Sequence, residues 1–289
     1  MSPTAREPQH ELVDFARPPV AEVVLAVQFA AETIDLEVYG RFASEIRAEL
    51  PRRTRQPLVP RNEETFGQPV APPSIEVVLE GPTDLPRIMF ESDDGVELVQ
   101  LQPHRLTLNW RGTMSGADYP RYGALRKRFR QLLVRLTKAL DDEGQKHPVE
   151  LAEVTYVNPI EYPGGATSDD VGQTHPDLAN IINRVKHRPD NAFLPEAEDA
   201  KLEARWRIPA AAVGTTGPPA GRLHLSVMPA LKPQGRTPIY LVNLAARVMP
   251  SGGSVDRAMK ALDVGHEWVV LGFKDLTTTD MHTYWGLRQ

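Results

Sequence analysis

Apolar residues recur along this chain with two different spacings, and each spacing predicts a different element of secondary structure. Short β-branched runs and two-residue alternation predict strands, whereas apolar residues three and four positions apart predict helices. Strands are expected at residues 20–29, 75–79, 87–91, 96–101, 105–111, 149–162, 202–208, 222–228 and 238–249. Helices are expected at residues 35–50, 119–142, 178–186, 254–273 and 279–285.

Two of these strands distribute their polar residues differently. Residues 20–29 are nearly apolar on both faces, which predicts a central strand of a sheet. In residues 105–111, by contrast, Leu106, Leu108 and Trp110 share one face. The other face of this strand is polar or charged, with Arg105, Thr107, Asn109 and Arg111. This alternation is typical of an antiparallel sheet that has one face in contact with solvent.

The clearest helix is expected at residues 119–142. Its apolar stripe consists of Leu125, Phe129, Leu132, Leu133, Leu136 and Leu140. Gly144 is placed to end the helix. The opposite side is basic and includes Lys127 and Arg130. Such a face could hold an acidic peptide or a phosphate, although solvated helices commonly carry charged faces without binding anything.

The predicted elements occur twice in the same order: a strand, a helix, several strands and a long helix. Strands grouped between helices predict an α+β fold, with antiparallel sheets covered by the long helices. The repeated order suggests an internal pseudo-duplication. We expect a flexible arm at residues 1–16, an N-terminal α+β half at residues 17–148 and a C-terminal α+β half at residues 149–289. The halves are expected to pack intimately, as two units or as one domain.

Composition narrows the class of protein. Of the 289 residues, 41% are hydrophobic and 25% are charged, as in ordinary globular proteins. The net charge of -5 disfavours nucleic acid as a partner. No apolar run approaches the ~18 residues of a membrane span, and residues 1–11 lack the layout of a signal peptide, which favours the cytoplasm. The absence of cysteine excludes disulfides, thiolate metal sites and cysteine nucleophiles.

The most suggestive chemical cluster lies near the C-terminus. Asp263 and His266 are three residues apart, so they share a helix face and suit a metal site or an acid–base pair, with His282 as a third member. His266 also lies on an apolar stripe with Leu262, as a histidine at the edge of a core does. We favour this second interpretation, because two or three candidate ligands without a known spacing are weak evidence for a metal. No metal and no cofactor are expected.

A further polar position is Asn158, which precedes Pro159 at the end of a strand and is therefore held in extended geometry. Its amide could read the backbone of a ligand or satisfy a neighbouring strand. The second role is favoured, because polar groups near cores usually pair locally.

Three stretches of the chain together resemble a known family. They are Pro18-Pro19-Val20-Ala21-Glu22-Val23-Val24, then Tyr156-Val157-Asn158, and then Leu262-Asp263-Val264-Gly265-His266 continuing through Phe273, Leu276-Thr277, Met281-His282 and Trp285-Gly286. In this order they resemble a sporadically distributed bacterial family. The chain also resembles the peptide-binding accessory proteins of pathways for ribosomally made, modified peptides, particularly the crocagin type. The resemblance implies a protein that presents or protects a precursor peptide, and it carries over no catalytic residues.

The sequence therefore predicts a non-catalytic protein that binds a precursor peptide through Arg105, Thr107, Asn109, Arg111, Lys127 and Arg130. The peptide would pair with a sheet edge or lie along the polar sheet face, where arginines meet its acidic residues. A tailoring enzyme is a further candidate partner, and a homodimer is an open option. One alternative is a hydrolase or small-molecule modifying enzyme built on Asp263, His266 and His282. Another is a defence-associated interaction protein.

Overall fold

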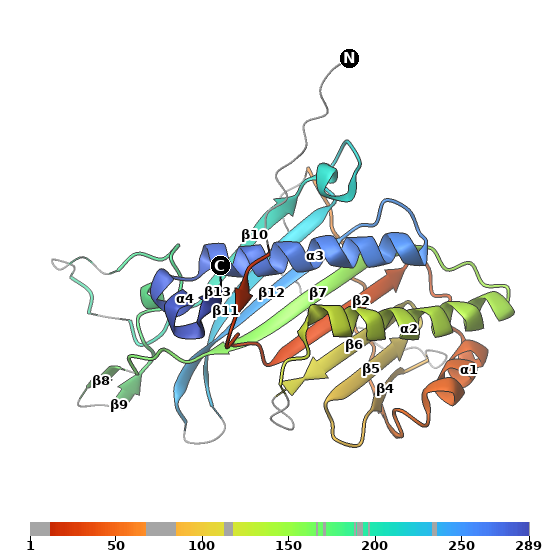
Figure 1. Cartoon of the computed structure of the whole chain (residues 1–289), viewed down its shortest axis with the longest axis horizontal. Coiled ribbons are helices and arrows are strands. Elements are labelled where there is room, and N and C mark those ends of the chain that lie inside the picture. The colour runs from red at the N-terminus through yellow and green to blue at the C-terminus, as the bar shows by residue number, and fades with distance from the viewer. Residues whose placement is uncertain are drawn as a thin grey trace, which may run out of the picture.

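A computed structural model shows one large antiparallel sheet with long helices on one of its faces (Figure 1). It describes residues 12–67, 85–112, 118–165, 167–169, 172–187, 189, 193–195, 197–232 and 236–288. Helices and antiparallel strands are mixed in it, which confirms the α+β prediction. Within these residues, no helix is both long enough and apolar enough to cross a membrane.

Nine of the described strands form the large sheet, and each pair of neighbours is antiparallel. From edge to edge they are β10 (Leu202–Ile208), β11 (Gly221–Leu231), β12 (Pro238–Val248), β7 (Val149–Ile160), β2 (Glu22–Phe29), β6 (Arg105–Arg111), β5 (Glu97–Gln102), β4 (Arg87–Glu91) and β3 (Arg52–Gln56). Two small sheets pair β1 (Asp14–Phe15) with β13 (Leu287–Arg288), and β8 (Thr167–Asp169) with β9 (Gly172–Thr174). The helices are α1 (Leu36–Ile46), α2 (Arg121–Asp142), α3 (Val255–Leu276) and α4 (Thr279–Trp285).

The two halves of the chain start from the middle of the sheet and follow the same course. β2 and β7 are neighbours at the centre; beyond β2 lie β6, β5 and β4, and beyond β7 lie β12, β11 and β10. In each half a central strand is followed by a helical segment, three consecutive strands that approach the centre in chain order, and a long helix. The expected repeat thus has a counterpart in the strand order. β3, which extends the sheet beyond β4, belongs to the N-terminal half alone.

The side chains give the sheet an apolar face and a polar face. The apolar face carries fully buried side chains such as Leu25, Leu108 and Val154, and α2 and α3 run across it (Figure 1). Gly265 and Gly272 let α3 lie close to the strands. A Cβ at Gly265 would be 3.2 Å from Val154 Cγ2, and a Cβ at Gly272 would be 2.7 Å from a Leu223 methyl carbon.

Residues 57–67 lie on the polar face of the sheet. Gln28 on β2 holds this segment by two hydrogen bonds with the backbone of Asn62, at 3.0 and 2.9 Å. Glu64 of the same segment is 2% exposed and accepts hydrogen bonds from Arg222 and His224 on β11. The segment therefore ties the N-terminal half to the C-terminal half across the sheet.

Local sequence explains where the main elements lie. β2 is the fifth of the nine strands, which confirms the central strand predicted from its apolar faces. Asp35 begins α1 by accepting a hydrogen bond from the Val38 N–H at 3.0 Å. Gly144 follows α2 with a φ of 66°, a left-handed conformation that favours glycine.

Several expectations differ from the structure. The arm expected at residues 1–16 ends in a strand, because Phe15 is buried in edge-on contact with Phe273 and Trp285. β3 forms inside the Pro/Arg-rich segment expected to be only a connection, since its backbone pairs with β4. The helix expected at residues 178–186 is one 3₁₀ turn, Leu178–Asn180. The strand expected at residues 75–79 lies outside the described residues.

Candidate functional site

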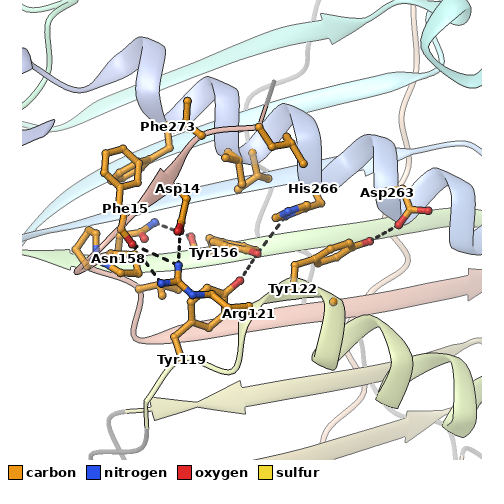
Figure 2. Close-up of a pocket in the computed structure, with 18 residues that line it drawn as sticks. Asp14, Phe15, Tyr119, Arg121, Tyr122, Tyr156, Asn158, Asp263, His266 and Phe273 are labelled. Carbon is orange, nitrogen blue, oxygen red and sulfur yellow. Dashed lines mark hydrogen bonds and ion pairs between the residues drawn. The ribbon is translucent and has the colours of Figure 1, made fainter. Parts of the chain in front are cut away.

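An apolar pocket of about 480 Å³ opens between the start of α2, the middle of α3 and the central strand β7 (Figure 2). The segment before β2 forms a further wall, with Leu12, Phe15 and Val20 among its lining residues. A volume of this size falls in the range of small-molecule and side-chain pockets, roughly 300–1,000 Å³. The lining is mostly apolar, and several polar groups point toward the same space, which is the usual composition of a ligand site.

The three stretches that carry the family resemblance meet at this pocket. Pro18 and Pro19 come from the segment before β2, Tyr156 and Asn158 from β7, and His266 from α3. These stretches are more than a hundred residues apart in sequence, and the pairing of β2 with β7 brings them together. The close approach of α3 at Gly265 places the neighbouring His266 at the pocket wall.

Hydrogen bonds link two tyrosines and a histidine at the pocket. The Tyr119 and Tyr156 hydroxyls are 2.6 Å apart, and the Tyr156 hydroxyl is 3.1 Å from Nδ1 of His266. The ring of Tyr122 stacks on the imidazole of His266, with a centroid separation of 3.8 Å and an interplanar angle of 8°. Figure 2 shows these rings side by side between α2 and α3. The stacking and the hydrogen bond together fix the imidazole in one orientation.

Burial keeps this group of side chains uncharged at neutral pH. It raises the pKa of Tyr119 to about 12 and that of Tyr156 well above its ordinary value. It also raises the pKa of Tyr122, with a further contribution from the neighbouring Asp263 carboxylate. Burial lowers the pKa of His266 to about 4, although Asp263 opposes that shift. The three tyrosines and His266 are therefore neutral hydrogen-bonding partners for a ligand rather than charges.

Asp263 lies at the pocket but is held by other side chains. Its carboxylate accepts two hydrogen bonds from the Arg126 guanidinium, at 2.5 and 2.8 Å, and one from the Tyr122 hydroxyl at 3.0 Å. An arginine bound in this two-pronged way fixes the position of the carboxylate. Asp263 thus links α3 to α2 and orients Tyr122 over His266.

Arg121 joins the start of α2 to the N-terminal wall of the pocket. Its guanidinium is 2.6 Å from the Asp14 carboxylate and also donates to the Phe15 carbonyl (Figure 2). Arg288 of β13 pairs with the same carboxylate at 3.0 Å. Arg121 has a φ of 68°, which is rare for a residue with a side chain and marks local strain. The wall is therefore held from both α2 and the C-terminal strand.

The expected cluster of Asp263, His266 and His282 does not form. Asp263 and His266 both line the pocket, but His282 bonds instead to the Thr277 hydroxyl at 2.9 Å. Its position in the middle of α4 lets it reach the Thr277 hydroxyl, just after the end of α3, rather than His266. No group of three potential metal ligands occurs among the described residues. Asn158 donates to the Val242 carbonyl of β12 at 3.0 Å, which confirms its predicted role in satisfying a neighbouring strand.

The six residues expected to contact a peptide do not form one surface. Four share the polar face of β6, as predicted: Arg105, Thr107, Asn109 and Arg111. Lys127 and Arg130 are exposed on α2, which covers the opposite face of the sheet. The basic side of α2 therefore lies on the far side from the polar strand residues.

The β6 residues also have partners within the protein. Arg105 pairs with Glu153 at 3.0 Å, and Asn109 donates to Glu22 at 2.6 Å. Arg111 pairs with Glu91 at 2.7 Å, and Thr107 is buried. The polar face is less solvated than predicted, because residues 57–67 cover part of it.

Sequence reasoning missed three residues of the pocket: Tyr119, Arg121 and Tyr122. Tyr119 precedes α2 and Tyr122 lies in its first turn, so both belong to the segment where the helix begins. Proline before the first helical residue also marked this helix start as unusual, since the Pro120 ring provides no side-chain cap. The contact of these residues with β7 and α3 is a long-range feature, which no local pattern reports.

No protein-family model matches this chain, and no curated protein matches it significantly. The family resemblance of the three stretches therefore stays a prediction. The pocket is assigned from its geometry.

Proposed function

We propose that this protein binds a peptide without converting it, and that the pocket beside His266 receives an apolar or aromatic side chain of that peptide. The observation that carries the proposal is the combination of apolar walls with a neutral, internally hydrogen-bonded polar group. A pocket of this kind gains free energy from burying apolar surface and gains orientation from one or two hydrogen bonds. The charged residues of the lining, Asp14, Arg121 and Asp263, already have ion-pair partners within the protein.

The state of the polar groups favours binding over catalysis. A general base must accept a proton near neutral pH, whereas the pKa of His266 is about 4 and its Nδ1 is already bonded to Tyr156. Asp263 is occupied by Arg126 and Tyr122. Nucleophilic catalysis needs a nucleophile next to a base. The pocket places the Tyr156 hydroxyl beside His266, but burial raises the pKa of that hydroxyl well above its ordinary value and so disfavours the nucleophilic phenolate.

A precursor peptide is the proposed ligand because the resembling stretches Pro18–Val20, Tyr156–Asn158 and Asp263–His266 converge on the pocket. In that setting the protein would present the peptide to a tailoring enzyme or protect it from proteolysis. The binding mode differs from the one expected from sequence. The anchor is an uncharged side chain in a pocket rather than acidic residues on arginines, so moderate salt should change affinity little.

Titration calorimetry against the short peptides encoded beside the gene tests the proposal. Val270 lines the pocket and is half-buried, so Val270→Trp fills the cavity without removing a core side chain. We expect this variant to bind at least tenfold more weakly. Val134→Trp is the matched control, because Val134 is 44% exposed on α2 and does not line the pocket.

Equal binding by Val270→Trp and the unaltered chain would place the peptide elsewhere. Absence of heat with every neighbouring peptide, together with conversion of a small molecule by the purified protein, would replace the proposal with the enzyme alternative. Tyr156→Phe adds a finer test, since it keeps the ring and removes the hydroxyl bonded to His266. It should weaken binding only for peptides whose anchor side chain carries a polar group.

A further inference from the structure

The two edges of the large sheet differ in how they are protected. β3, at one edge, is exposed at each of its five residues and carries Arg52, Arg53 and Arg55. Like charges on an edge strand discourage pairing with another copy of the same strand. β10, at the other edge, has a strand neighbour on one side only within the described part of the chain. Its outer row of backbone N–H and C=O groups is a template for a further strand.

The strand order of the two halves shows what an added strand would do at β10. β4 and β10 occupy corresponding places, each three strands out from its central strand. In the N-terminal half, β3 occupies the position outside β4 and pairs with it through five residue pairs. Among the described residues, no strand occupies the corresponding position outside β10 in the C-terminal half.

The side chains of β10 alternate in chemistry between the two faces. Leu202, Ala204 and Trp206 face the helix side and are half-buried. Glu203 and Arg205 are exposed on the polar face and have opposite charges. Alternating chemistry of this kind suits pairing with a strand of the same pattern, because directly opposed residues in an antiparallel pair lie on the same face.

A second apolar groove runs beside this edge. It measures about 290 Å³ and is bounded by Trp206 on β10, Leu223 on β11 and by Trp268 and Leu271 on α3. Trp268 and Leu271 are half-exposed, although most of the apolar stripe of α3 is buried. A second chain that pairs with the strand edge and covers the groove would gain both backbone hydrogen bonds and buried apolar surface.

We propose that β10 pairs antiparallel with β10 of a second copy of this chain, around a two-fold axis that passes beside Ala204. In this register Glu203 of each copy faces Arg205 of the other, which gives two opposite-charge pairs on the polar face. Leu202 faces Trp206 on the helix side, so each copy covers the groove of the other. The small side chain of Ala204 lies at the axis, where the two copies approach most closely.

The register centred on Ala204 sets Glu203 opposite Arg205 without placing either residue opposite its own copy. A shift that centres the axis on Glu203 places two carboxylates opposite each other, and a shift that centres it on Arg205 places two guanidinium groups opposite each other. Like charges directly opposed across strands are destabilising. In the proposed register the two like pairs, each formed by Lys201 and Arg207 of the other copy, flank the centre, and both side chains are exposed so that solvent screens them.

Charge exchange tests the pairing in solution by light scattering after size exclusion. The unaltered chain should have a mass near twice its 32.1 kDa. Glu203→Arg and Arg205→Glu should each shift it toward the monomer, with at least a tenfold weaker dimer. The double variant should restore the dimer, because it exchanges the two charges. Arg55→Glu on β3 is the matched control and should leave the mass unchanged.

Cross-linking tests the register. The chain has no cysteine, so Ala204→Cys introduces a single thiol at the axis. Mild oxidation should convert it to a disulfide-linked dimer, whereas Thr54→Cys, at the middle of β3, should stay monomeric on a non-reducing gel. A monomeric mass at high protein concentration, or a double variant that is not restored, would overturn the proposal. Neither result bears on the peptide pocket, which lies away from β10.

Discussion

The N-terminal and C-terminal halves share a strand order, yet they differ where each long helix begins. α3 begins at Ser254, whose hydroxyl accepts a hydrogen bond from the Arg257 N–H. α2 begins after Pro120 without a side-chain cap, and its first residue, Arg121, has a left-handed backbone. The candidate pocket lies at this irregular start and not at the corresponding start of α3. The two halves therefore share the strand order that builds the sheet. The pocket lies where they differ, at the start of the long helix.

The largest expected effects test whether the halves fold as one unit. Phe129 on α2 and Phe273 on α3 are buried in the same core. Replacing either phenylalanine with alanine should lower the free energy of unfolding by about 3–5 kcal/mol, since both transfer energy and packing are lost. Chemical denaturation followed by fluorescence should give one transition for both variants. Two separate transitions would show independent halves, and Leu36→Ala, at a side chain 66% exposed, serves as the control.

The second effect concerns the contact between the halves on the polar face. Glu64→Ala should destabilise the protein by about 3 kcal/mol, because Arg222 and His224 lose a buried carboxylate. Burial alone would raise the pKa of Glu64, but hydrogen bonds from His224 and Arg222 lower it below its ordinary value. Its contribution is thus present at neutral pH and is lost as pH falls through the lowered pKa. Glu64→Gln should flatten the acid limb of a stability–pH curve, and an unchanged acid limb would contradict this linkage.

A smaller effect compares one histidine from each half. Burial lowers the pKa of His104 and that of His266 to about 4, from an ordinary value of 6.5. Between these pH values the unfolded chain binds protons that the folded chain does not, so stability falls as pH decreases through the window. His104→Gln and His266→Gln should each reduce that fall by about 1–3 kcal/mol. Urea midpoints at pH 7.5 and pH 4.5 measure it, and a slope unchanged by both substitutions would contradict the assignment.

The smallest expected effect concerns the helix starts. Asp35→Ala at α1 and Ser254→Ala at α3 should each lower the free energy of unfolding by about 1 kcal/mol, because each removes an acceptor for a free N–H group of the first turn. Thermal unfolding resolves a change of this size. A loss at α1 without one at α3 would indicate that the longer cap bond, 3.3 Å against 3.0 Å, contributes nothing.

The fold was largely predictable because its signals are local. Apolar faces marked β2 as central, and the spacing of Leu125, Phe129 and Leu132 defined α2. β3 was missed because it has no apolar side to pack, and its backbone pairing with β4 leaves no mark on composition. The pairing of β2 with β7 could not be predicted from sequence either. A strand that is apolar on both faces fits several partners and registers equally well.

The site was predictable only in part. The helical spacing of Asp263 and His266 predicts a shared face, and both line the pocket, but the expected third member, His282, bonds to Thr277 instead. Sequence could not show that Arg126 occupies Asp263 or that Tyr122 stacks on His266, because these contacts join elements more than a hundred residues apart. The alternation along β6 predicts a solvated face for its arginines, but residues 57–67 and neighbouring carboxylates occupy that face.

The pairing of β1 with β13 brings residues 14 and 15 beside residues 287 and 288. Asp14 lies opposite Arg288 and Phe15 opposite Leu287, so in a chain that starts at Asp14 a few linking residues could join Arg288 to Asp14. A circular permutant could then be opened between α2 and β7, which would reverse the order of the two halves in the sequence. Since the halves meet through β2 and β7 in space, this reordered chain should reach the same sheet. Folding would then depend on strand pairing and not on which half is synthesised first.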